Sequence, residues 1–110
     1  MSYFFSNPTI DNPIAAANIL IHKYNEGRLC NENPSDFYCG ITKDPMRRMD
    51  EHNLAKGTFN WWVKTNCLET AQGVEDIMDS KGFDCGSQIV NGDSDSVFVY
   101  IYRKSNQTKE

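Results

Sequence analysis

The sequence predicts an α+β domain in which a small, mainly antiparallel sheet of three or four strands is flanked by helices. Runs rich in aromatic and β-branched residues, typical of strands, occur at 37–42, 59–65 and 97–103. Segments with apolar residues at helical spacing separate them, at 13–25 and 68–81. A chain of 110 residues is long enough for one hydrophobic core. We therefore treat the whole chain as a single domain.

The first helix is expected over residues 13–25, as a helical extension before the first strong strand. Asn12 followed by Pro13 favours a helix start, because Asn caps the first free amides and proline suits the first helical position. Gly27 is a suitable stop. Apolar residues recur at core spacing: Ile14, Ala17, Ile21 and Tyr24.

The next two elements are a strand over 37–42 and a helix over 45–53. Side chains alternate along a strand, so the apolar set should face the core: Phe37, Cys39 and Ile41. The opposite face carries Tyr38, Gly40 and Thr42. Asp44 before Pro45 favours the helix start, and Arg48 and His52 then lie one turn apart on one helix face. A phenol, a guanidinium and an imidazole can therefore converge.

The run from Tyr38 to Asn53 reads Tyr-x-Gly-Ile-Thr-x-Asp-x-x-Arg-Arg-x-x-Glu-His-Asn. It resembles the second half of the GIY-YIG nuclease domain, and most closely its small stand-alone members. Tyr38 and Gly40 correspond to the Tyr and Gly of the "YIG" half. Arg48 falls where the family keeps its catalytic arginine, and His52 where it usually keeps histidine or tyrosine. The resemblance implies that Tyr38, Arg48 and His52 are catalytic.

The first half of the family pattern has no counterpart, because residues 29–36 read as a polar loop where a "GIY" strand is expected. The strongest strand signal lies instead at 97–103. We hypothesise that this C-terminal strand takes the central place of the missing one, as a permuted strand beside 37–42. Tyr100 or Tyr102 would then substitute for the lost tyrosine. The alternative is that both aromatic rings only pack in the core or across strands.

The helix expected over 68–81 carries a candidate metal ligand. Ala71, Val74 and Met78 form an apolar stripe, and Glu75 lies at its edge. A carboxylate beside a buried face is costly unless it is compensated. Family members carry a metal-binding glutamate four residues after an alanine, so the resemblance implies that Glu75 holds one Mg²⁺ or Mn²⁺. Otherwise Glu75 is solvated or pairs with a lysine.

Three further segments lead to more limited expectations. Trp61 and Trp62 should alternate across the strand 59–65, one facing the core and one exposed, where it could stack on a base, anchor a protein or cover a core edge. Residues 88–90 could add a short strand that turns through Asn91–Gly92. Residues 105–110 should form a loose tail.

Charge is distributed unevenly along the chain. The net charge is −4, but residues 43–64 contain five basic and three acidic residues, a net +2, and the remainder carries −6. The basic stretch coincides with the candidate site, so binding to nucleic acid should be modest and salt-sensitive. The residues expected to contact substrate are Gly40, Lys43, Arg47 and Lys56.

The cysteines and the chain start bear on the compartment. Cys30, Cys39, Cys67 and Cys85 have neither paired spacing nor histidines at zinc spacing, so reduced thiols are expected. The start lacks the features of a secretion signal, and no apolar run is long enough for a membrane span. We expect a cytoplasmic protein that does not bind membranes.

The resemblance implies metal-dependent phosphodiester hydrolysis of nucleic acid, with DNA the favoured form, through a single cation. Tyr38 would act as general base or orient the water, Arg48 would neutralise the phosphate, and His52 would bond the tyrosine or relay a proton. The alternative is a catalytically impaired module of the same fold that binds nucleic acid or a protein partner, as a regulator or inhibitor. The acidic surface and the missing first motif favour that alternative.

Overall fold

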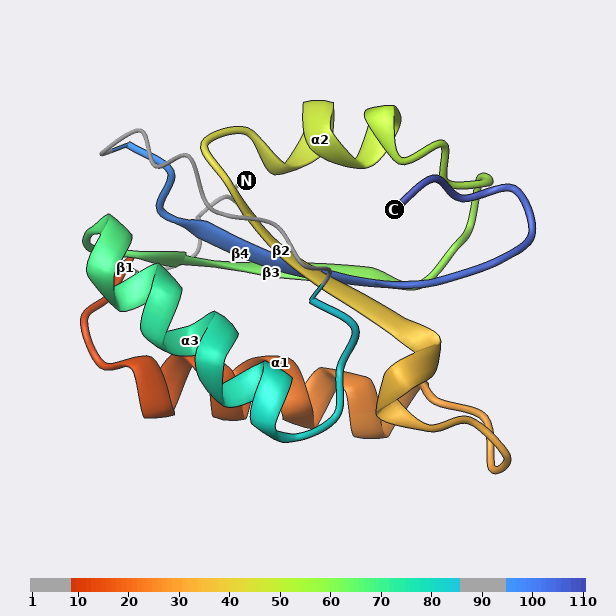
Figure 1. The fold of residues 1–110 in the computed structure, drawn as a ribbon, viewed down its shortest axis with the longest axis horizontal. Coiled ribbons are helices and arrows are strands. Elements are labelled where there is room, and N and C mark those ends of the chain that lie inside the picture. The colour runs from red at the N-terminus through yellow and green to blue at the C-terminus, as the bar shows by residue number, and fades with distance from the viewer. Residues whose placement is uncertain (1–8, 86–94) are drawn as a thin grey trace, which may run out of the picture.

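A computed structural model describes residues 9–85 and 95–110 of this chain. It shows an α+β domain with a four-stranded mixed sheet, which confirms the predicted fold class. Helices α1 and α3 cover one face of the sheet, and α2 covers the other (Figure 1). The elements in chain order are β1 (Thr9–Ile10), α1 (Pro13–Gly27), the short 3₁₀ helix η1 (Pro34–Asp36), β2 (Phe37–Thr42), α2 (Pro45–Glu51), β3 (Asn60–Thr65), α3 (Leu68–Ser80) and β4 (Phe98–Arg103).

The C-terminal strand occupies an interior position of the sheet. The strand order is β1-β3-β4-β2, and β4 is antiparallel to both of its neighbours. Tyr38 lies opposite Tyr102, and Gly40 lies opposite Tyr100. The hypothesis that the C-terminal strand lies beside the strand carrying Tyr38 is therefore confirmed. Strand β1 was not predicted from the sequence, because it has only two residues; it pairs parallel with β3.

Helix starts follow the capping residues identified in the sequence. The Asn12 side chain accepts hydrogen bonds from the amides of Ile14 and Ala15 at 2.8 and 3.1 Å, and the Asp44 side chain accepts one from the Arg47 amide at 3.1 Å. Helix α2 ends at Glu51, because His52 is its cap and Asn53 adopts a left-handed backbone with φ 62°. The predicted strand at 88–90 and its turn lie outside the described residues.

The sheet separates two apolar clusters. The larger one lies under α1 and α3 and contains Phe37 and Cys39, with Ile41 packed against it, as the alternation predicts. The smaller one lies under α2 and consists of four buried residues: Tyr38, Met49, Tyr100 and Tyr102. Polar rings therefore replace aliphatic side chains on the α2 face. The groups that could take part in catalysis therefore lie on the α2 face of the sheet.

The edge of β2 is not fully open. The Cys39 amide donates to the Asp84 carbonyl at 2.8 Å, and the Asp84 amide donates to the Phe37 carbonyl at 3.0 Å. These bonds form a parallel bridge between Tyr38 and Asp84. Residue 84 therefore lies alongside the backbone of Tyr38, next to the candidate site.

The C-terminal segment, residues 105–110, is not the loose tail that its polar composition predicts. The Lys109 amide donates to the His52 carbonyl at 2.8 Å, and the Asn53 side chain donates to the Gln107 carbonyl at 3.0 Å. The Gln107 side chain returns a bond to the Asn53 carbonyl at 3.3 Å. The physical reason is that the end of α2 leaves backbone carbonyls without helical partners, and this segment supplies donors for them.

All four cysteines are free, and Cys39 and Cys85 are buried. A side-chain hydrogen bond to Cys85, followed by burial, raises the pKa of the Cys39 thiol well above its ordinary value, so this thiol stays protonated. Within residues 9–85 and 95–110, no helix is both long and apolar enough to cross a membrane.

Candidate active site

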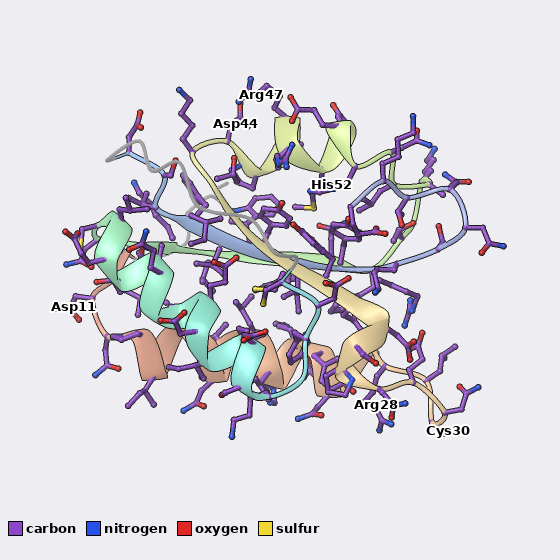
Figure 2. All side chains as sticks on the ribbon, in the orientation of Figure 1. Asp11, Arg28, Cys30, Asp44, Arg47 and His52 are labelled. Carbon is purple, nitrogen blue, oxygen red and sulfur yellow. The ribbon has the colours of Figure 1, made fainter. Side chains whose placement is uncertain are left out.

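Three tyrosines and one histidine meet between α2 and the sheet. Tyr38 from β2 and Tyr100 and Tyr102 from β4 project from the same face, because antiparallel register places them on matching rows. The His52 ring centroid lies 5.1 Å from that of Tyr38, 5.6 Å from Tyr100 and 4.9 Å from Tyr102. We call these four residues the tyrosine–histidine cluster. Figure 2 shows His52 in the space between α2 and the sheet.

Gly40 makes room for this cluster. A Cβ atom at position 40 would lie 2.6 Å from Tyr100 Cζ and still closer to its hydroxyl. Because Tyr100 is 1% exposed, its ring has no free space into which it could move. The "YIG" glycine therefore has a packing role here, beneath the ring of Tyr100 on the neighbouring strand.

Replacing Gly40 with alanine is expected to lower the free energy of unfolding by about 1–3 kcal/mol, the usual cost of overpacking a closed site. Urea denaturation measures it. The double variant Gly40→Ala/Tyr100→Phe removes the nearest atom, so its loss should be smaller than the sum of the two single losses. If the losses of the two single variants simply added in the double variant, position 40 and the Tyr100 ring would not be in contact.

The hydrogen bonds around His52 determine its tautomer. Nδ1 lies 2.5 Å from the Lys109 carbonyl oxygen, which can only accept, so Nδ1 carries the proton. Nε2 of the neutral ring is then an acceptor, and the Tyr100 hydroxyl donates to it at 2.7 Å. Tyr102 lies 3.0 Å from Nδ1 and donates its own proton to Glu110 at 2.9 Å. Tyr100 is therefore the phenol that is paired with a base.

Burial lowers the pKa of His52, and the charge of Arg48 lowers it further. The Lys109 carbonyl and the charges of Glu110 and Glu51 act in the opposite direction and do not overcome burial. The imidazole is therefore neutral at neutral pH and can take up a proton at Nε2. This charge state agrees with the tautomer inferred from the hydrogen bonds.

Arg48 connects the cluster to solvent. Its guanidinium donates to Glu51 at 2.8 Å and lies close enough to Tyr100 to lower the pKa of that phenol. The Arg48 side chain is 41% exposed, whereas the cluster residues are at most 6% exposed. Burial raises the pKa of Tyr100 most strongly, and Arg48 opposes that shift. Arg48 is thus the member of the site that an anion can reach directly.

Arg47, one position earlier, has a different environment. Its guanidinium lies 4.0 Å from Glu51, and Glu51 makes its shorter contact with Arg48. Figure 2 shows Arg47 on the side of α2 that faces away from the sheet. Arg47 is therefore a surface charge near the site and a suitable control for Arg48.

Tyr38 lies within electrostatic range of both faces of the sheet. Burial raises the pKa of its phenol, the charge of Arg48 lowers it, and the charges of Glu75 and Asp84 raise it. Glu75 belongs to α3, which packs on the face opposite α2. No described hydrogen bond or ion pair joins Glu75 to Tyr38, Arg48 or His52. The structure therefore brings three predicted catalytic residues together and leaves Glu75 connected to them only through the electrostatic interaction with Tyr38.

The Glu75 carboxylate lacks a partner among the residues that the structure describes. Burial raises the pKa of Glu75 to about 7, and Asp76 and Asp79 add to the shift. A half-buried carboxylate without a donor or cation fits a divalent ion, and Mg²⁺ commonly uses one or two carboxylates together with water and substrate phosphates. Within the described ranges, no group of three or more His, Cys, Asp or Glu residues is arranged to hold a metal ion.

The remaining predicted residues lie around the rim. Lys43 is exposed just before α2. Lys56 lies in the loop between α2 and β3, where it lines a pocket. The tryptophans alternate as predicted: Trp62 packs against the tyrosine–histidine cluster, and Trp61, on the other face, is 37% exposed with the Lys23 ammonium 4.2 Å above its ring.

Two residues that close the cluster were not predicted from the sequence. Lys109 and Glu110 contact His52 and Tyr102, and their polar, lysine-rich surroundings carry no pattern that would have revealed this. A buried histidine needs partners for both ring nitrogens, and that requirement was the one available signal.

Removing residues 105–110 takes away part of the burial that lowers the pKa of His52, and also the Lys109 carbonyl and the Glu110 charge, which raise it. Because burial outweighs both of them, we expect the pKa of His52 to rise toward its ordinary value. Nuclear magnetic resonance titration of the imidazole carbon protons measures it. His22 is the other histidine and is exposed on α1, so His22→Gln assigns the signals. An unchanged His52 titration would show that this segment does not cover the ring in solution.

No family model, no curated protein and no solved structure matches this chain. The likeness to GIY-YIG nucleases therefore stays a resemblance, based on the run from Tyr38 to Asn53 and on the residues that β4 adds to it.

Proposed function

We propose that this protein hydrolyses phosphodiester bonds of nucleic acid, with DNA the favoured substrate, in a reaction that depends on a divalent cation. One observation carries the proposal: β4 places the Tyr100 hydroxyl 2.7 Å from His52 Nε2 and within electrostatic range of Arg48, on the strand next to Tyr38. A phenol, a base and a guanidinium are the groups that such a reaction needs. Tyr100, more than Tyr102, suits the role of the missing tyrosine.

The proton path follows from the tautomer of His52. Tyr100 passes its proton to His52 Nε2, and the resulting phenolate takes a proton from the water that attacks phosphorus. The water oxygen forms the new P–O bond while the bond to the leaving oxygen breaks, and the leaving oxygen takes up the proton that His52 gained. The Lys109 carbonyl holds the Nδ1 proton throughout and stabilises the imidazolium that forms. Tyr38, on the neighbouring strand, orients the water.

Arg48 would bind the scissile phosphate. It is the exposed member of the site, and its contact with Glu51 is an exposed ion pair of the kind that contributes little to stability. A phosphate can therefore replace Glu51 and gain charge-assisted hydrogen bonds. Glu75 would hold the cation, which when bound supplies positive charge for the phosphate oxygens.

A second candidate function is the noncutting module that binds nucleic acid or a protein. The burial of the cluster favours it: Tyr100 and His52 are each 1% exposed, and residues 109–110 bond to His52 and Tyr102. A substrate reaches Tyr100 only if this C-terminal segment moves. In the noncutting candidate the segment stays in place and the cluster serves as a polar core.

Cleavage of single-stranded, duplex and branched DNA with Mg²⁺, Mn²⁺ or a chelator separates the two functions. We expect cation-dependent cleavage by the native protein, and a loss of about 10²-fold or more in both Arg48→Ala and Glu75→Ala. Cleavage that survives both changes would refute the proposed site. Binding that weakens with salt, without cleavage of any substrate, would select the noncutting module.

A further inference from the structure

A pocket of about 240 Å³ opens beside the tyrosine–histidine cluster, between α2, the following loop and β3. Its lining combines apolar and polar residues. The apolar residues include Met46, Met49, Leu54 and Trp62. The polar residues include Asp50, Lys56, Thr58 and Asn60. Because Met49, Leu54 and Trp62 also pack on the cluster, the pocket and the candidate active site share a wall.

The polar groups of the pocket are open to a ligand. Among the described residues, neither the Asp50 carboxylate nor the Lys56 ammonium has an ion-pair partner. The Asn60 side chain donates to the Thr58 carbonyl at 3.0 Å, which leaves its oxygen as an acceptor. The lining therefore includes acceptors at positions 50 and 60 and a cation at Lys56. A ligand that fits carries an amino group, a flat apolar ring and an anion.

We propose that this pocket binds one unpaired nucleotide whose base bears an exocyclic amino group. The base lies against Trp62, its amino group donates to Asp50 or Asn60, and its phosphate contacts Lys56. Aromatic side chains commonly hold unpaired bases in this way, and lysine holds the adjacent phosphate. The inference rests on the proposed function in one respect: it makes the nucleotide part of the substrate strand, next to the bond that is cut.

The pocket also predicts a preference among bases. Asp50 and the Asn60 oxygen both accept hydrogen bonds, so adenine, cytosine and guanine can satisfy them with an amino group. Uracil and thymine have no amino group, and the two carbonyl oxygens that flank their N3–H repel these acceptors. We expect adenosine and cytidine monophosphates to bind several-fold more tightly than uridine monophosphate, and Asp50→Asn to reduce that difference.

Nucleotide titration followed by nuclear magnetic resonance tests the proposal without cleavage, because Arg48→Ala is used as the host protein. The two tryptophan indole signals are the readout, and Trp61→Phe assigns them. Adenosine monophosphate should shift the Trp62 signal and leave that of Trp61 unchanged. Lys56→Gln should weaken the binding of adenosine monophosphate about 5-fold or more and leave the binding of adenosine unchanged. Lys81→Gln, on an exposed turn after α3, should change the binding of neither ligand.

The outcomes of this titration test the base pocket separately from the proposed hydrolysis. Shifts produced equally by inorganic phosphate, or equal binding of all four nucleotides, would overturn the base pocket, and so would an unmoved Trp62 signal. Binding at Trp62 in a protein whose native form cuts no DNA would leave the pocket standing and refute the proposed hydrolysis. Cleavage by the native protein without nucleotide binding at Trp62 would refute the pocket and leave the proposed hydrolysis standing.

Discussion

Replacing Tyr100 with phenylalanine is expected to slow single-turnover DNA cleavage by about 10²–10⁴-fold, the usual effect of removing a group that transfers protons in the transition state. Tyr100 is the phenol that donates to His52 Nε2, so no proton path remains without it. The change also leaves the buried Nε2 without a donor, which costs about 1–3 kcal/mol of stability. Affinity for DNA should change little, because Arg48 keeps its charge.

Tyr102→Phe is the matched control. Tyr102 is as deeply buried as Tyr100 and also contacts His52. Its hydroxyl, however, donates to Glu110 and accepts from the protonated Nδ1 of His52. We expect Tyr102→Phe to retain cleavage within about 10-fold of the native rate. If Tyr102→Phe were the inactive variant and Tyr100→Phe the active one, the assignment of the substitute tyrosine would be reversed.

Replacing Glu75 with glutamine is expected to raise the free energy of unfolding by about 1–2 kcal/mol at pH 8 and to leave it unchanged at pH 4. The pKa of Glu75 is raised to about 7 in the folded protein. Between its ordinary value and 7, the folded state binds more protons than the unfolded state, so stability falls as pH rises. The magnitude is reduced for the part of the group that solvent screens.

Urea denaturation across this pH range measures the effect. Adding Mg²⁺ or Mn²⁺ at pH 8 should stabilise the native protein and not Glu75→Gln, because only the native carboxylate binds a cation. Glu69→Gln, an exposed position on the same helix, should change stability by less than about 0.5 kcal/mol at any pH. If the free energy of unfolding of the native protein changed neither with pH nor with added cation, Glu75 would not be a metal ligand of this site.

The regular elements could be predicted because local signals agree at each of them. Asn12 and Asp44 cap the helices that they were expected to cap, and the alternation in 37–42 assigns Cys39 to the core. The position of β4 beside β2 was a hypothesis from a family pattern with one strand missing. It was testable because antiparallel pairing puts residues on one face in register.

Other parts of the site depend on contacts between distant segments. The bond between His52 and Lys109 joins residues 57 positions apart. Because it uses a backbone carbonyl, the residue type at position 109 does not predict it. Glu75 was correctly assigned to the edge of a helix stripe. Which face of the sheet that helix covers, however, is decided by the packing of α3 against α1 and not by the pattern of α3 itself.

Whether Arg48 and Tyr100 act in one site is tested by the single-turnover cleavage rate of the double variant Arg48→Ala/Tyr100→Phe beside its two single variants. Groups that act together on one phosphate give losses that do not multiply. We expect the double variant to be about as slow as the slower single variant. Losses that multiply, or a double variant as fast as the native protein, would contradict a shared site.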